Sequence, residues 1–224
     1  MNSGMIRHLV AKDWSFQRVP IVLAIVTTLV SLGLLLANSS GMFYVGAVLL
    51  ISVVITVGIY LAFMTVINER TEGMLPFIMT LPIGVREYTA AKLVANLVLF
   101  LVPWLAAIVG AYLVITTRAA VPDGLLPFAV VILLHLATGY VLTLGTALIT
   151  GSSGWTIGVG GGANLVLQGF MYWVSHLPDV AATIDGPVAV WTNSIRWLIG
   201  AELLAMVAIL WITWIWQSRR TDFT

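Results

Sequence analysis

Residues 42–67 read MFYVGAVLLISVVITVGIYLAFMTVI, a run without a single charged side chain. A helix of about 20 apolar residues crosses the hydrocarbon core of a bilayer, so this run is long enough to span it. Lipid offers no partners for backbone polar groups, and the strands of a membrane barrel would need alternating polarity in segments of about ten residues. The stretch therefore predicts a membrane-spanning helix.

The rest of the chain has the same character. Of its 224 residues, 60% are hydrophobic and 8% are charged, whereas soluble domains carry about 25% charged residues. We predict an all-α integral membrane protein, with residues 1–224 forming a single transmembrane domain. Its expected spans are residues 20–37, 42–67, 93–117, 125–150, 155–174 and 195–216. Six helices nearly use up the chain, so a large aqueous activity is expected to come from another chain.

Composition also excludes several classes. The first apolar run is longer than the apolar region of a signal peptide and lacks a small-residue cleavage site, so we expect it to be retained. A net charge of +1 argues against a nucleic acid partner, and the absence of cysteine excludes disulfides and thiolate chemistry. None of the three histidines forms a metal-ligand pair in sequence, so no metal site is predicted.

The distribution of basic residues predicts the orientation, because cytoplasmic loops are enriched in Lys and Arg. With the N-terminus inside, only Arg118 and Arg196 face outward. The cytoplasmic side then receives Arg7, Lys12, Arg18, Arg70, Arg86, Lys92, Arg219 and Arg220. We therefore expect a multi-pass protein of the plasma (inner) membrane, with both termini in the cytoplasm and membrane lipid as a partner.

Residues 1–19 precede the first span. Ile6, Leu9, Val10 and Trp14 fall at helical spacing on one side, which favours an amphipathic helix lying in the membrane interface before Pro20. The alternative is a disordered basic tail that only sets the topology.

The loop of residues 68–92 concentrates charge between two apolar runs. Thr71 can cap a short helix whose apolar face includes Leu75 and Ile78, and Pro82 with Gly84 would end it. Such a face can contact a protein partner or lie on the membrane surface, and the sequence pattern allows both.

The sequence of this loop is similar to a segment found in a known protein family. Asn68-Glu69-Arg70-Thr71-Glu72-Gly73, then Thr80-Leu81-Pro82-Ile83 and Arg86-Glu87-Tyr88 with Lys92, resembles the loop between spans two and three in permease subunits of type-2 ATP-binding-cassette exporters. The resemblance implies that the loop holds a coupling helix that docks on a separate ATPase subunit. It maps docking onto Glu69, Arg70, Glu72, Gly73, Leu75, Phe77, Ile78 and Leu81. Met74 and Pro76 depart from the family pattern and suggest that the helix begins at about Leu75.

The chain has no G-x-x-x-x-G-K-[ST] phosphate loop, so it is not expected to be an ATPase itself. Within the resemblance, ATP and magnesium belong to the partner ATPase, and a second permease copy or a paralogue completes the transporter. The resemblance also implies that residues 175–194 form short helices that dip into the outer leaflet; without it, the segment is expected to be an interfacial hairpin.

Two rows of polar residues lie within the predicted spans. Ser52, Thr56 and Tyr60 share one face of the second span, and Asn164, Gln168 and Tyr172 share one face of the fifth. In the resembling family these two spans border the translocation path, so the six residues are candidate path-lining residues. The alternative is hydrogen bonding between helices of one subunit.

Other intramembrane features have competing interpretations. His135 on the fourth span and Glu202 on the sixth are possible functional residues, and the alternative for each is a structural role; Glu202 is expected near Arg196 and His176. Gly154, Gly158 and Gly162 repeat every four residues, a pattern that favours close packing by another helix.

The sequence thus favours a permease subunit that moves amphipathic or hydrophobic molecules such as drugs, peptides or lipid-like compounds out of the cytoplasm. The alternatives are an intramembrane enzyme and an ion-coupled carrier, both without an ATPase partner.

Overall fold

A computed structural model describes residues 3–71 and 85–219. All regular elements in these ranges are helices. The helices are α1 Ser3–Leu36, α2 Ser40–Ala62, the π-helix η1 Phe63–Ile67, α3 Asn68–Thr71, α5 Val85–Thr117, α6 Leu125–Thr150, α7 Ser153–Ser175, α8 Pro178–Ala181 and α9 Asn193–Ser218.

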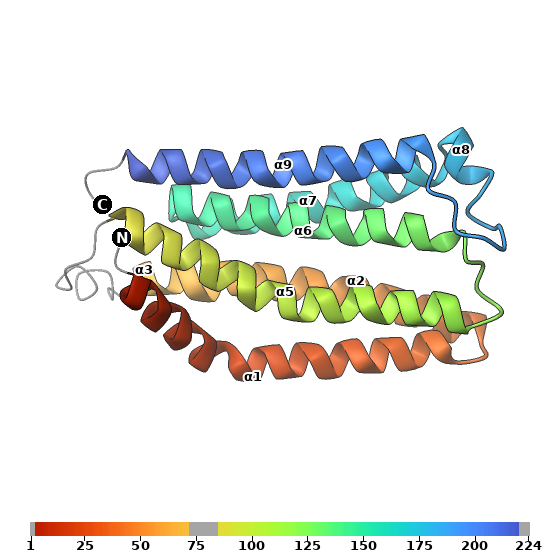
Figure 1. The fold of residues 1–224 in the computed structure, drawn as a ribbon. Helices are drawn as coiled ribbons and strands as arrows, with labels where there is room; N and C mark the ends of the chain where they lie inside the picture. Colours follow the sequence, from red (N-terminus) through yellow and green to blue (C-terminus); the bar gives the residue numbers. More distant parts are fainter. Residues whose placement is uncertain (1–2, 72–84, 220–224) are drawn as a thin grey trace.

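The long helices run side by side in one bundle (Figure 1). Helix α6 is central, since it packs against α2, α5, α7 and α9, while α1 packs against α2 and α5. Helix α1 begins and α9 ends at the same end of the bundle, which we call the base (Figure 1). Helix α8 and the connections that follow α1 and α5 lie at the opposite end, which we call the far end.

Five helical segments are long and apolar enough to cross a membrane: Ala11–Leu36, Ser40–Ile67, Thr89–Thr117, Leu125–Thr150 and Asn193–Ser218. They confirm the prediction of an all-α, multi-pass membrane protein. Helix α7 occupies the place of the predicted span 155–174 and has 23 residues, but it is not among these five. Its glycines and its polar residues Asn164 and Gln168 lower its hydropathy, so the sixth span stays a prediction.

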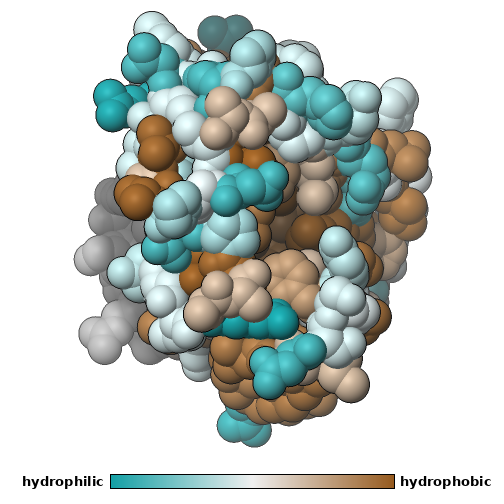
Figure 2. Space-filling view, turned by 90° about the vertical axis from the view of Figure 1, so that its right-hand side faces the viewer, coloured by the Kyte–Doolittle hydropathy of each residue, from teal (hydrophilic) through white to brown (hydrophobic). Residues whose placement is uncertain are grey.

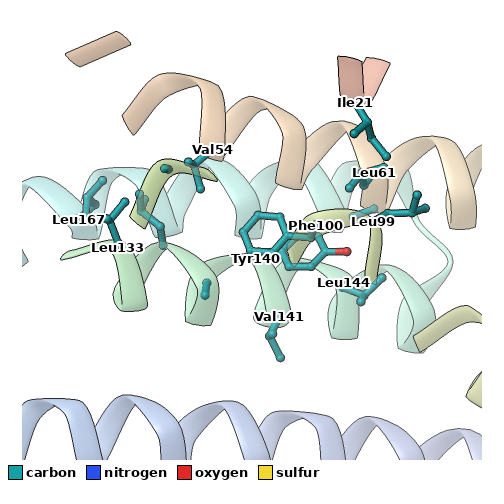
Figure 3. Close-up of a cluster of buried hydrophobic side chains, with 14 of the residues drawn as sticks. Ile21, Val54, Leu61, Leu99, Phe100, Leu133, Tyr140, Val141, Leu144 and Leu167 are labelled. Carbon is teal, nitrogen blue, oxygen red and sulfur yellow. The ribbon is translucent and has the colours of Figure 1, made fainter. Parts of the chain in front are cut away.

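The core is built from side chains that several helices direct toward α6 (Figure 3). Leu61, Leu99 and Leu144 are almost completely buried. The rings of Phe100 on α5 and Tyr140 on α6 stack with centroids 4.0 Å apart. The outward side of α1 instead exposes apolar side chains, including Val22, Leu23, Val26 and Leu29. A bundle that is apolar both inside and outside is what a lipid environment requires.

Two predicted boundaries differ from the structure. Residues 3–36 form one helix with Pro20 inside it, where a separate interfacial helix had been expected to end at residue 19. Figure 1 shows that α1 bends part of the way along, and proline removes one backbone hydrogen bond and bends a helix without having to end it. Helix α5 already begins at Val85, so Lys92 belongs to this helix and is not part of an exposed loop.

The glycines of helix α7 lie on two different faces. A Cβ atom added at Gly160 would lie 3.2 Å from Ile59 of α2 and 3.4 Å from Thr143 of α6, so this glycine permits close packing. Cβ atoms at Gly158, Gly161 and Gly162 would meet nothing within 4 Å in the part of the chain that is described. The close contact within the subunit therefore uses Gly160, and the row with four-residue spacing lies on an open face.

Candidate functional site

A cluster of buried charges lies near the base of the bundle. The Lys92 Nζ atom on α5 is 2.9 Å from Asp13 Oδ2 on α1 and 2.8 Å from Glu69 Oε1 on α3. Lys12 Nζ on α1 lies 3.3 Å from the same Glu69 oxygen. We call Lys12, Asp13, Glu69 and Lys92 the base cluster.

The base cluster balances two positive charges against two negative charges. Lys92 is only 2% exposed, Asp13 6% and Glu69 8%, whereas the Lys12 side chain remains 38% exposed. Charged groups this deeply buried are tolerated when they are paired and hydrogen-bonded. The cluster ties three segments together: the first part of α1, the helix that leads into residues 72–84, and the helix that follows them.

A second polar network continues from the base cluster into the bundle. Asn96 is completely buried one turn after Lys92, and its Nδ2 donates to the Lys92 carbonyl oxygen at 2.9 Å. The Thr65 hydroxyl on η1 lies 2.7 Å from Asn96 Oδ1, and the Tyr140 hydroxyl on α6 donates to the Asn96 carbonyl oxygen at 2.9 Å. These bonds join η1, α5 and α6. A π-helix interrupts the regular α-helical ladder here, and such interruptions often occur at functional sites.

The docking residues predicted for the loop are only partly described. Glu69 was expected on an exposed docking surface, but its carboxylate faces Lys92 and Lys12 and is buried. In this structure Glu69 therefore holds the base of the loop together. The side chain of Arg70 and residues Glu72, Gly73, Leu75, Phe77, Ile78 and Leu81 lie outside the described part of the chain.

The two polar rows lie on the outside of the bundle. Ser52, Thr56, Gln168 and Tyr172 are exposed, and Tyr60 and Asn164 are partly exposed. The Asn164 amide donates to the Gly160 carbonyl of its own helix at 3.3 Å. Within the described residues, none of the six side chains forms a hydrogen bond to another helix.

His135 and Glu202, singled out separately in the sequence, form a pair between α6 and α9. His135 Nδ1 lies 2.7 Å from Glu202 Oε1, and the side chains are 18% and 11% exposed. The His135 ring stacks on Phe170 of α7 with centroids 4.0 Å apart. The expected neighbour His176 instead contacts the Tyr172 carbonyl oxygen and the Ser175 hydroxyl. The acidic group inside the bundle thus has a histidine as its partner.

A small cavity of about 30 Å³ lies between α2, α6 and α7 and is lined by both His135 and Asn164. A cavity needs about 10–15 Å³ of such volume to hold one water molecule, so there is room for at least one. His135 of the pair and Asn164 of the polar row on α7 thus border the same cavity. In residues 3–71 and 85–219, no three acidic or histidine side chains gather closely enough to hold a metal ion.

At the far end, a carboxylate fixes the start of α9. Asp179 Oδ2 on α8 accepts a hydrogen bond from the Ser194 backbone N–H at 3.2 Å. Desolvation acts to raise the pKa of Asp179, but hydrogen bonds from Ser194 and Thr192 outweigh it and lower the pKa below its usual value. The segment 175–194, expected to be a hairpin or short helices, contains the short helix α8 and turns.

Sequence reasoning missed the base cluster and the Asn96 network. Lys92 was counted only as a charge that sets the orientation and marks a loop, and Asp13 was not considered. A signal existed, because Asn96 and Lys92 are four residues apart and therefore share one helix face, with a polar side chain inside an apolar run. The partners from α1 and α3 could not be identified in this way, since they lie far away in the sequence.

Comparison of the chain with protein-family models, with curated proteins and with solved structures finds no match.

Proposed function

We propose that the chain is the permease subunit of a type-2 ATP-binding-cassette exporter. Two copies, or one copy and a paralogue, would form the translocation path, and separate ATPase subunits would bind ATP and magnesium. The cargo would be amphipathic or hydrophobic molecules leaving the cytoplasm. The observation that carries the proposal is the base cluster, which joins both flanks of the coupling-type loop to the first helix.

A coupling loop must transmit force to the membrane helices. Glu69 precedes residues 72–84 and Lys92 follows them, and the two side chains are paired at 2.8 Å. Asp13 extends this link to α1 at 2.9 Å. A displacement of the loop would therefore move α1, α2 and α5 as a unit, because separating them would leave unpaired charges inside the protein. ATPase subunits that prefer one arrangement of the loop could then bias the whole bundle.

The proposal includes six spans, with α7 as the fifth. The exposed polar rows on α2 and α7 support a path between two subunits, since polar groups facing lipid are costly and those facing a water-filled path are not. The open glycine face of α7 supports close contact with a second copy. In this arrangement the base faces the cytoplasm, in agreement with the excess of Lys and Arg on that side.

The test is ATPase association. The tagged chain, purified from its native membranes in mild detergent, should carry an ATPase that contains a G-x-x-x-x-G-K-[ST] motif, identified by mass spectrometry. Leu75→Asp with Ile78→Asp should remove this ATPase while the chain remains in the membrane. Val188→Asp with Val190→Asp is the matched control, because it makes the same chemical change at exposed positions of the far end.

Equal recovery of the ATPase with the loop variant and the control would refute the proposal, as would its absence from the wild type. Glu69 is not suitable for this test, because reversing its charge would disrupt the base cluster and would confuse docking with folding.

The His135–Glu202 pair favours one alternative, an ion-coupled carrier, because intramembrane acid and histidine pairs occur in proton relays. In liposomes without ATP or an ATPase, such a carrier would move a fluorescent amphipathic dye in response to a pH gradient, and Glu202→Gln would stop the movement. Dye movement that requires both ATP and the ATPase would exclude the carrier.

A further inference from the structure

An apolar cavity and a charged hollow meet at the far end of the bundle. The apolar cavity has a volume of about 310 Å³ and lies between α2, α5 and α6. Its lining includes Leu50, Ile51, Ala111, Ala129 and Ile132. An apolar cavity of about 150 Å³ is already enough to bind a small hydrocarbon, so this cavity has room for a larger apolar group.

The cavity is placed where a lipid chain could enter it. Tyr44 lines the cavity and is 69% exposed, so the cavity reaches the outer surface of the bundle. Leu35 at the end of α1 and Leu125 at the start of α6 also line it, which places it near the helix ends. That surface is otherwise covered with exposed apolar side chains of the kind that contact lipid. The apolar group available to fill the cavity is therefore an acyl chain from the lipid leaflet at the far end.

The charged hollow lies directly beside the cavity. It has a volume of about 570 Å³, is lined by Arg118, Asp123 and Asp185, and shares Ile115 with the apolar cavity. It lies between two segments that are held together by a hydrogen bond from Gly124 N–H to the Gly186 carbonyl oxygen at 3.0 Å. Figure 2, which looks onto the far end, shows hydrophilic side chains around exposed hydrophobic ones.

Arg118 stands at the boundary between the two spaces. Its Nη1 donates to the Leu35 carbonyl oxygen at 2.5 Å, and its Cζ lies 5.2 Å from the centre of the Phe43 ring. Leu35 and Phe43 both line the apolar cavity. The Nε atom of Arg118 is buried and has no hydrogen-bond partner among the residues that the structure describes. The guanidinium is thus fixed in place with donors to spare, and guanidinium groups bind phosphate well.

We propose that the far end binds a phospholipid with an ethanolamine headgroup. Its acyl chain occupies the apolar cavity, its phosphate contacts Arg118, and its ammonium contacts Asp123 and Asp185. The guanidinium of Arg118 is complementary to the phosphate of such a zwitterionic headgroup, and the carboxylates of Asp123 and Asp185 are complementary to its N–H donor. A glycerol headgroup brings no cation for the carboxylates, and a choline headgroup has no N–H to donate. The site does not depend on transport or on an ATPase.

The experiment is native mass spectrometry of the purified full-length chain in detergent. Phosphatidylethanolamine, phosphatidylglycerol and phosphatidylcholine with identical acyl chains are titrated separately, and the apparent Kd of the first bound lipid is compared. The wild type should bind phosphatidylethanolamine most tightly. Arg118→Gln should weaken this binding by about tenfold, because a hydrogen bond to a charged group is lost.

Two further variants separate headgroup from chain. Asp123→Asn with Asp185→Asn should remove the preference for phosphatidylethanolamine over phosphatidylglycerol. Ala129→Phe, which fills the apolar cavity, should weaken the binding of all three lipids. Arg196→Gln is the matched control, because Arg196 is an exposed arginine on α9 near the far end, outside both spaces, and its removal should change nothing.

Three results would each overturn the proposal. One is a wild type that binds the three lipids equally. Another is an equal loss of binding in Arg118→Gln and in Arg196→Gln. The third is unchanged lipid binding in Ala129→Phe.

Discussion

Replacing Lys92 by methionine tests whether the base cluster holds the bundle together. Methionine is of similar length and apolar, so the change removes the charge and leaves much of the volume in place. Lys92 lies 2.9 Å from Asp13 and 2.8 Å from Glu69. After the replacement, Lys12 can still neutralise Glu69 at 3.3 Å, but Asp13 has lost its close partner.

The expected loss of stability depends on what happens to the buried carboxylate of Asp13. A carboxyl group with an ordinary pKa of about 3.9 can be neutralised by protonation, which costs about 4 kcal/mol at pH 7. Breaking a buried ion pair by removing one partner costs about 3–5 kcal/mol in other proteins. We therefore expect Lys92→Met to lower the free energy of unfolding by about 3–5 kcal/mol at pH 7.

The assay is unfolding in mixed micelles with increasing SDS, followed by tryptophan fluorescence. Two signatures distinguish a lost ion pair from a packing defect. The difference in free energy of unfolding between the wild type and Lys92→Met should become smaller by about 2.7 kcal/mol when the pH is lowered from 7 to 5. The reason is that protonation of one carboxylate costs about 1.36 kcal/mol less for each pH unit. The double variant Lys92→Met with Asp13→Asn should be more stable than Lys92→Met alone, because no unpaired charge remains.

A Lys92→Met variant within about 1 kcal/mol of the wild type would refute the reasoning. So would a deficit of the expected size that is independent of pH, because it would point to a cavity and not to an unpaired charge.

Three further predictions concern the other features of the bundle. Gly160→Leu should lower the free energy of unfolding by about 1–3 kcal/mol in the same assay, because the side chain meets α2 and α6. Gly158→Leu on the open face meets no other helix of the described part of the subunit and should not destabilise the monomer; an equal loss of stability in both variants would contradict the packing. His135→Ala should lower the free energy of unfolding by about 1.5–3 kcal/mol, since it removes a hydrogen bond to a charged group on α9. An unchanged free energy of unfolding would show that the pair is not formed. Because hydrogen bonds lower the pKa of Asp179, its stabilisation is complete above the usual pKa of about 4 and is lost as the pH falls through the lower folded value. The protection of the Ser194 N–H against hydrogen exchange, relative to the intrinsic rate at each pH, should therefore fall in the wild type only below about pH 4 and should already be lost in Asp179→Ala at pH 7. Equal protection in the two proteins at pH 7 would contradict the cap.

The apolar runs predicted most of the fold, because composition and length alone decide whether a segment can cross a membrane. Four expected spans coincide with apolar helices to within about four residues, and the first apolar helix begins earlier than expected, at Ala11. The sequence did not predict that α1 continues through Pro20, since a proline that bends a helix and one that starts a helix look alike in sequence. It also placed Lys92 in a loop, because a single charge gives no sign of a distant partner.

The candidate sites show the same limit. His135 and Glu202 attracted attention one by one, because each is unusual within a span, but their pairing spans 67 positions of the chain. The glycine row of α7 suggested packing, yet neighbouring helices decide which glycine is used, and here it is Gly160. Residue types can be recognised from sequence, whereas partners depend on the register between helices.

The π-helix Phe63–Ile67 has a consequence for how this chain can vary. A π-turn accommodates one residue more than an α-helical turn, and one residue in an α-helix corresponds to a rotation of about 100°. Deleting a single residue here would restore regular α-helical bonding but turn Glu69 away from Lys92. Relatives of this chain should therefore keep the number of residues between positions 63 and 67, whereas a change of residue type at an exposed position such as Met64 leaves the register intact.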